Sequence, residues 1–270
     1  MNRAIAPTAA LAAALAAALT GIPAAAILIR ADREDEEYRE LATRYPAAVA
    51  LEAVGGASAL IAPRWILTSA GRATALRAIK PAAKIAIAGR AHEIQEVHLH
   101  PDAGPGSDSD LALVFLRESV ASVEPSPIYR KDDEDGQATR VVGFGESGRI
   151  GEKHAAGISD RRPRAAINTV DRVTPRTLGL RLKGPDEASD LQGALAPGDA
   201  GAPAFFEVGG RIFVAGIASR NLDANGDGIA GNVGDWELFT RVSAFAAWID
   251  DVMSKTALEE AARETAKPRR

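Results

Sequence analysis

The sequence contains no cysteine among its 270 residues. This absence excludes disulfide bonds and metal sites that are built from thiolates. A strong excess of one charge is also missing, because 32 basic and 36 acidic side chains leave a formal net charge of −4. Such a weak negative charge gives no electrostatic reason to expect a nucleic-acid partner. The chain is long enough for one large β domain or a two-lobed unit with a substantial core.

Long hydrophobic runs are missing too, apart from an alanine- and leucine-rich stretch near the start. This stretch covers residues 9–19, follows Arg3 and is too short to span a bilayer comfortably. A glycine and a proline then interrupt it, and Ala24 to Ala26 offer the small side chains that signal peptidase reads. The pattern predicts a signal peptide over residues 1–26, with an uncleaved anchor as the alternative.

Cleavage after Ala26 would make Ile27 the new N-terminus. An exported chain without disulfides is typical of a bacterial periplasm or the external medium rather than of an animal secretory route. We therefore expect a secreted or periplasmic protein that has no stable membrane span after signal cleavage.

Beyond a charged segment at residues 32–44, which we expect to form a solvated arm or a short helical turn, the pattern changes to short apolar runs. Glycine, proline and aspartate separate these runs, and no helical segment lies between them. This spacing is typical of an antiparallel all-β sandwich or barrel. The runs lie at residues 48–51, 59–61, 65–68, 85–88, 94–97, 111–116, 141–144, 165–170, 178–182, 212–218 and 238–242.

Helical periodicity occurs only near the end of the chain, where apolar side chains between Phe245 and Val252 recur every three or four residues. This predicts a helix over residues 243–254, followed by a charged tail at 255–270 that we expect to fray.

A proline-rich and acidic stretch at residues 125–136 predicts the connection between two lobes. The lobes would cover about residues 27–130 and 131–242.

The most informative stretch is Pro-Gly-Asp-Ala-Gly-Ala-Pro at residues 197–203. It resembles the GDSGGP loop of the chymotrypsin/trypsin family, in which a strained turn presents a nucleophilic serine and points two backbone N–H groups at the developing oxyanion. Here Ala200 stands in the place of the nucleophile, and Ala202 replaces the second of the paired glycines. A methyl group cannot attack a carbonyl.

Further motifs that resemble this family occur in the family's order between residues 46 and 249. Together they imply two six-stranded antiparallel β-barrels with a cleft between them and a C-terminal helix, within a domain at residues 27–254. The motifs are WILTSA at 65–70, DLAL at 110–113, GFG at 143–145, VAGIAS at 214–219, TRVS at 240–243 and WI at 248–249.

The resemblance implies that two of the three catalytic groups are missing. Gly71 stands where the general-base histidine belongs and Ala200 where the serine belongs, whereas Asp110 matches the triad aspartate. Loss of the serine or the histidine of such a triad lowers turnover on the order of a million-fold. The amides of Gly198 and Ala200 would still offer an oxyanion hole, because they belong to the main chain. With no imidazole to orient, we favour a structural role for Asp110.

The same resemblance assigns further positions around the cleft. Asp199 matches the residue that pairs with a new N-terminal ammonium, which cleavage before Ile27 would supply; alternatively, Asp199 caps its own turn. Ala194 stands where a trypsin-like specificity would need an acid. Together with Leu195 and Ser219 it predicts a small or apolar pocket.

A separate motif follows the cleft strand. Asp223, Asn225 and Asp227 lie at alternate positions and match the first half of a calcium-binding loop, although Gly234 replaces the glutamate at its twelfth position. Turns formed by Asp and Asn side chains produce the same pattern, so both interpretations stay open. No cofactor is required, and Ca²⁺ is a possible ligand.

These features predict an exported serine-protease homologue that has lost catalysis and binds a peptide or protein in its cleft. Two alternatives remain: a serine-type endopeptidase of weak or unconventional activity, and a structural envelope protein that uses the fold without the cleft.

Overall fold

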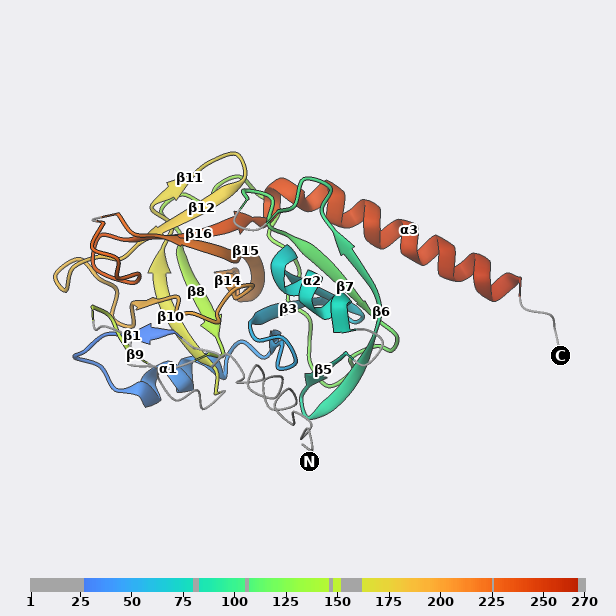
Figure 1. The fold of residues 1–270 in the computed structure, drawn as a ribbon, viewed down its shortest axis with the longest axis horizontal. Helices are drawn as coiled ribbons and strands as arrows, with labels where there is room; N and C mark the ends of the chain where they lie inside the picture. Colours follow the sequence, from blue (N-terminus) through green and yellow to red (C-terminus); the bar gives the residue numbers. More distant parts are fainter. Residues whose placement is uncertain are drawn as a thin grey trace, which may run out of the picture.

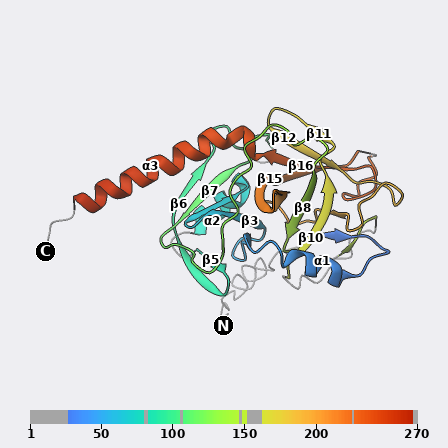
Figure 2. The same ribbon diagram turned by 180° about the vertical axis from the view of Figure 1, so that it is seen from behind.

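The computed structural model describes residues 27–79, 83–104, 107–145, 148–151, 162–224 and 226–266. The expected signal peptide at residues 1–26 and the candidate calcium ligand Asn225 lie outside these ranges. Two curled β-sheets form two lobes side by side, and a long C-terminal helix runs from the second lobe past the first and away from the body (Figure 1, Figure 2). No helix in the described ranges is long and apolar enough to cross a membrane.

The first lobe is a six-stranded antiparallel sheet in the order β2-β3-β4-β7-β6-β5. Leu60, Ile66 and Val114 of its central strands are completely buried. The strands are β2 (Ala48–Ala50), β3 (Ala57–Ala62), β4 (Trp65–Thr68), β5 (Lys84–Ile87), β6 (Arg90–Leu99) and β7 (Ala112–Leu116).

The second lobe is built on a seven-stranded sheet in the order β10-β8-β14-β15-β16-β12-β11. A three-stranded sheet, β13-β1-β9, lies beside it. The strands of the large sheet are β8 (Ala138–Gly143), β10 (Arg164–Thr169), β11 (Arg172–Val173), β12 (Thr177–Arg181), β14 (Pro203–Val208), β15 (Arg211–Leu222) and β16 (Trp236–Arg241), and those of the small one are β1 (Leu28–Ile29), β9 (Gly148–Arg149) and β13 (Gly193–Ala194).

The expected β architecture with two lobes is confirmed, and each of the eleven apolar runs overlaps a strand. The second lobe has one more strand in its main sheet than the expected six, because the short β11 extends the edge beyond β12. Strand β14 is absent from the predicted runs. It begins at a proline directly after the glycine-rich loop, so only a short apolar stretch marks it.

Two helices lie among the strands: the first falls in the charged segment, where we expected an arm or a short helical turn, and the second lies between apolar runs, where we expected none. The first is α1 (Asp35–Ala42), within the charged segment, and the second is α2 (Ala70–Ile79). Alanine, leucine and arginine, which dominate α2, are strong helix formers, and its buried side chains recur every three residues. That short period is a signal from which α2 could have been predicted.

The C-terminal helix begins with a 3₁₀ turn, η1 (Val242–Phe245), and continues as α3 (Ala246–Thr265). It therefore extends past the predicted end at residue 254 into the segment that we expected to fray. Arg64 of the first lobe explains this length, because its Nη1 and Nη2 donate to the carboxylate of Glu260 at 2.7 and 2.9 Å. The contact ties the outer part of the helix to the first lobe.

The N-terminal segment packs on the second lobe, although it precedes the first lobe in the chain. Strand β1 lies between β13 and β9, and α1 packs against β10. The buried hydroxyl of Tyr38 donates to the carbonyl of Gln192 at 2.8 Å, and the buried guanidinium of Arg164 pairs with Asp35. The predicted first lobe at residues 27–130 thus corresponds to the first sheet only from β2 onwards.

The two lobes meet closely at Gly201, which follows the candidate oxyanion loop. Its φ is +86°, and a Cβ placed there would lie 2.3 Å from the carbonyl oxygen of Ala57 and 2.4 Å from Oγ1 of Thr68. We predict that Gly201→Ala lowers the free energy of unfolding by about 3 kcal/mol, since it adds both backbone strain and a steric overlap. Urea denaturation of the full chain measures this value.

Gly209→Ala is the matched control, because Gly209 also has a positive φ but nothing lies within 4 Å of the added Cβ. It should cost only the backbone strain, about 1 kcal/mol. Equal losses in the two variants would contradict a tight contact between the lobes at Gly201.

Candidate functional site

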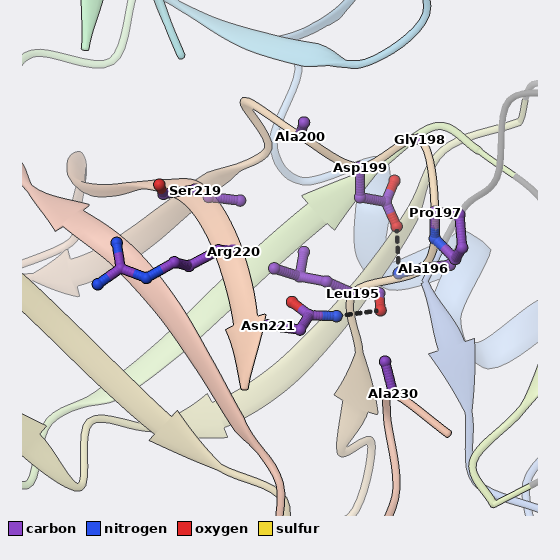
Figure 3. Close-up of a pocket in the computed structure, with 11 residues that line it drawn as sticks. Leu195, Ala196, Pro197, Gly198, Asp199, Ala200, Ser219, Arg220, Asn221 and Ala230 are labelled. Atoms are coloured by element: carbon purple, nitrogen blue, oxygen red, sulfur yellow. Dashed lines mark hydrogen bonds between the residues drawn. The ribbon is translucent and has the colours of Figure 1, made fainter. Parts of the chain in front are cut away.

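A pocket of about 270 Å³ lies between the glycine-rich loop and strand β15. It is lined by residues 195–200, residues 218–221 and Ala230 (Figure 3). Of the predicted pocket residues, Leu195 and Ser219 line it, whereas Ala194 lies in β13, is fully buried and does not. Sequence reasoning missed Asn221, whose Nδ2 donates to the carbonyl of Leu195 across the pocket at 3.2 Å.

The carboxylate of Asp199 holds the loop together from inside. Asp199 is 1% exposed, its Oδ1 accepts from the amide of Phe144 at 3.2 Å and its Oδ2 from the amide of Ala196 at 3.1 Å. A Cβ at Gly143 would lie 2.3 Å from Oδ1 of Asp199, so only glycine fits there. The aspartate therefore caps its own turn and also joins that turn to the end of β8.

Burial raises the pKa of Asp199 to about 8, although the surrounding amides and the charge of Arg164 act in the opposite direction. Within the described ranges, no basic side chain forms an ion pair with Asp199. The structure places Ile27 at 0% exposure beside Gly193. In the full chain the nitrogen of Ile27 is a peptide nitrogen, so its pairing with Asp199 after cleavage stays a prediction.

Asp110, which precedes strand β7, lies beside the start of helix α2, and both of its carboxyl oxygens accept hydrogen bonds. Its Oδ1 accepts from the amides of Ala70 at 2.8 Å and Gly71 at 3.4 Å, and its Oδ2 accepts from the hydroxyl of Ser219 at 3.1 Å. Burial raises the pKa of Asp110, and these donors oppose the increase. The contact with Ser219 connects Asp110 to the pocket wall, which sequence reasoning did not predict. It also fits the structural role that we favoured.

Gly71 and Ala200, which stand where the resemblance places the general base and the nucleophile, carry neither an imidazole nor a hydroxyl. A Cβ built on Gly71 meets nothing within 4 Å, so a side chain at position 71 has space. The N-terminus of α2 nevertheless lies close to the loop. A Cβ built on Gly56 would lie 2.6 Å from Cδ of Arg72 in α2 and 2.7 Å from the carbonyl oxygen of Ala200 in the loop, so both segments pack against Gly56.

The predicted oxyanion-hole amides belong to the lining of the same pocket. Gly198 and Ala200 are both partly exposed, and Gly198 has a φ of +101°. Neither amide donates a hydrogen bond to any residue in the described part of the chain. They are therefore available to an acceptor on a ligand.

The candidate calcium loop is held by its own main chain. Asp223 accepts from the amides of Gly226 at 2.6 Å and Gly228 at 2.8 Å, and Asp227 accepts from the amide of Ile229 at 2.8 Å. In the described ranges, no group of three acidic or histidine side chains is placed to hold a metal ion. This arrangement favours the turn interpretation, and calcium binding with Asn225 stays a hypothesis.

The chain matches the model of a known family. The family model described as Trypsin matches residues 34–249, from the start of helix α1 into helix α3.

The buried carboxyl of Asp199 predicts a pH dependence of stability. Its pKa in the folded protein, about 8, lies above the ordinary value of 3.8, so the folded state holds a proton that the unfolded state releases. Stability contributed by Asp199 is therefore greatest below pH 4 and is lost as the pH rises to about 8, by up to about 1.4 kcal/mol per pH unit. Asp199→Asn should remove this part of the slope, whereas Asp186→Asn, at an exposed acid, should retain it.

Denaturant titrations between pH 4 and 9 measure these slopes. A chain that begins at Ile27 should have a flatter slope than one that retains Ala26, because a paired ammonium would lower the pKa of Asp199. Identical slopes in wild type and Asp199→Asn would show that the carboxyl is not protonated in the folded state.

Proposed function

Because the chain belongs to the trypsin family, we propose that it is an exported pseudoprotease that binds a peptide or protein in the cleft and does not cleave it. The observation that carries this proposal is the combination of Ala200 and Gly71 with an otherwise intact site. The two groups that transfer the proton and attack the carbonyl are the groups that are missing. The pocket, the free amides and the buried aspartates remain.

A bound peptide has a strand edge available. Strand β15 pairs with β14 only as far as Ile217, whereas residues 220–222 pair with β16 on one side. Beyond Ile217, β14 does not continue along the other edge of β15, and Arg220 and Asn221 border the pocket. Extended peptides add to such edges through main-chain hydrogen bonds, and adjacent pockets select side chains.

The amides of Gly198 and Ala200 supply a second anchor. Two N–H donors at the pocket would hold a carbonyl oxygen of the ligand, as an oxyanion hole does. Without a nucleophile the same donors stabilise binding alone. A peptide would be retained intact.

The alternative of a weak or unconventional endopeptidase keeps the same site and differs in turnover. The alternative of a structural envelope protein keeps the fold and makes no use of the cleft. Export to the periplasm or the medium depends on residues 1–26 acting as a signal peptide. The small residues before Ile27 support cleavage there.

Binding without cleavage can be measured directly. We expect the wild-type chain to bind members of a random peptide library and to return them intact after prolonged incubation, with no labelling by a fluorophosphonate probe. Mass spectrometry identifies the peptides that bind and shows whether they are intact. Cleaved peptides and labelling would support the endopeptidase, and a library without any binder would support the structural protein.

The retained geometry predicts that chemistry can be partly restored. Ala200→Ser alone lacks a base, and Gly71→His alone lacks a nucleophile, so neither should hydrolyse an activated ester above wild type. The double variant should exceed both by about 10²-fold and react with fluorophosphonate, because Gly71 has room for a side chain beside Asp110.

Circular dichroism and urea denaturation should first show that the double variant folds. A folded double variant as inert as wild type would show that the groups at positions 71 and 200 do not come within reach of each other.

A further inference from the structure

The outward face of the second lobe carries a group of side chains that the cleft does not use. Strands β12, β16 and β15 are neighbours in the large sheet (Figure 1), and Trp236 of β16 lies directly opposite Arg181 on one side and Leu222 on the other. Side chains of such directly paired residues share one face of a sheet. The opposite face carries Leu180 and Phe239, which belong to the buried core of the lobe. Trp236 and its two neighbours therefore point away from the core.

Arg172 of the edge strand β11 adds a fourth side chain to this group. It pairs with Gly179 of β12, and a Cβ built on Gly179 would lie 3.1 Å from Cε3 of Trp236 and 3.3 Å from Cβ of Arg172. The indole ring and the stem of the arginine thus both pack against this glycine. We call Arg172, Arg181, Leu222 and Trp236 together the Trp236 face.

The first lobe covers another part of the same sheet face and leaves the Trp236 face accessible. Oγ1 of Thr240, which lies further along β16, donates to the carbonyl of Asp110 at 3.1 Å. Leu222, in contrast, is 42% exposed, the two arginines are exposed and Trp236 is partly exposed. A single exposed apolar side chain is ordinary, but tryptophan and arginine gathered around a leucine are typical of binding surfaces.

The charges of this face favour an acidic partner. Among the described residues, neither Arg172 nor Arg181 forms an ion pair, and Asp171, the acid next to Arg172 in the chain, pairs with Lys183 at 2.7 Å. The two arginines occupy diagonal positions of neighbouring strands, so their like charges repel each other. A carboxylate between them would relieve this repulsion, and the planar guanidinium group binds carboxylates through two parallel hydrogen bonds.

We infer that the Trp236 face is a second binding surface, which takes an acidic segment of a protein or peptide partner. Carboxylates of the partner pair with Arg172 and Arg181, and an apolar side chain packs on Trp236 and Leu222. A nucleic acid is the weaker match, because a phosphate backbone calls for a longer row of cations and the protein has a net charge of −4.

This surface is separate from the pocket. Leu222 follows Asn221 in β15, so their side chains point to opposite faces of the sheet, and Asn221 is the one that lines the pocket. The inference therefore goes beyond the proposed function and does not depend on it.

The test uses a fluorescein-labelled peptide of Glu-Leu-Glu repeats and a matched peptide of Gln-Leu-Gln repeats. Fluorescence anisotropy with the full chain measures both affinities. At low salt the glutamate peptide should bind at least about tenfold more tightly than the glutamine peptide. This preference should shrink at about 1 M salt, because exposed charges are then screened.

Variants assign the preference to the two arginines. Arg172→Gln and Arg181→Gln should each weaken binding of the glutamate peptide about threefold, and the double variant should bind both peptides alike. Both positions are exposed, so the variants are expected to fold. Arg90→Gln, at an exposed arginine of β6 in the first lobe, is the matched control and should bind as wild type does.

Tryptophan emission locates the bound peptide independently of charge. The unlabelled glutamate peptide should shift the emission to shorter wavelength, because an apolar contact removes water from the partly exposed indole of Trp236. Trp236→Phe should remove this shift.

Three results would overturn the inference. They are no binding of the glutamate peptide, equal affinity for the two peptides, and a preference that the double arginine variant retains. A single-stranded DNA oligonucleotide that binds as tightly as the glutamate peptide, and is lost in the double variant, would show a general polyanion site and overturn the peptide partner. Failure of the peptide library to bind in the cleft would leave all of these measurements unchanged.

Discussion

The buried carboxyl of Asp199 is the interaction on which the site depends. It takes amide hydrogens from its own turn and from the end of β8, so it fixes the loop that carries Gly198 and Ala200 against the second lobe. A buried acid requires such partners, because an unsatisfied polar group in the interior costs free energy. This burial also constrains the sequence, because residue 143 must be a glycine for the carboxyl to approach.

The N-terminal segment supports the same region from the other side. Helix α1 reaches Gln192 through Tyr38, and the amide side chain of Asn168 in β10 donates to the carbonyl of Gly193 at 2.9 Å. Strand β1 pairs with β13 immediately before the loop. These contacts therefore hold residues 192–194, which precede the pocket-lining segment, in place.

The groups that the site lacks and the groups that it retains would serve two different kinds of chemistry. Proton transfer and attack need side chains, and those positions hold Gly71 and Ala200. Recognition needs amides, a strand edge and a cavity, all of which are main chain or packing. Both oxygens of Asp110 accept hydrogen bonds, one from the start of α2 and one from Ser219 in the pocket wall.

The sequence alone determined the strands whose apolar runs are local, the order of the family motifs and the identity of the groups at positions 71 and 200. These features are readable because each depends on a few neighbouring residues. Only the tertiary structure decided that residues 27–42 pack on the second lobe and that β14 forms after the glycine-rich loop. It also decided which residues line the pocket, because Leu195 and Asn221 lie far apart in the chain and come together only in the folded protein. Burial and long-range pairing arise between segments far apart in the chain, and no local pattern contains them.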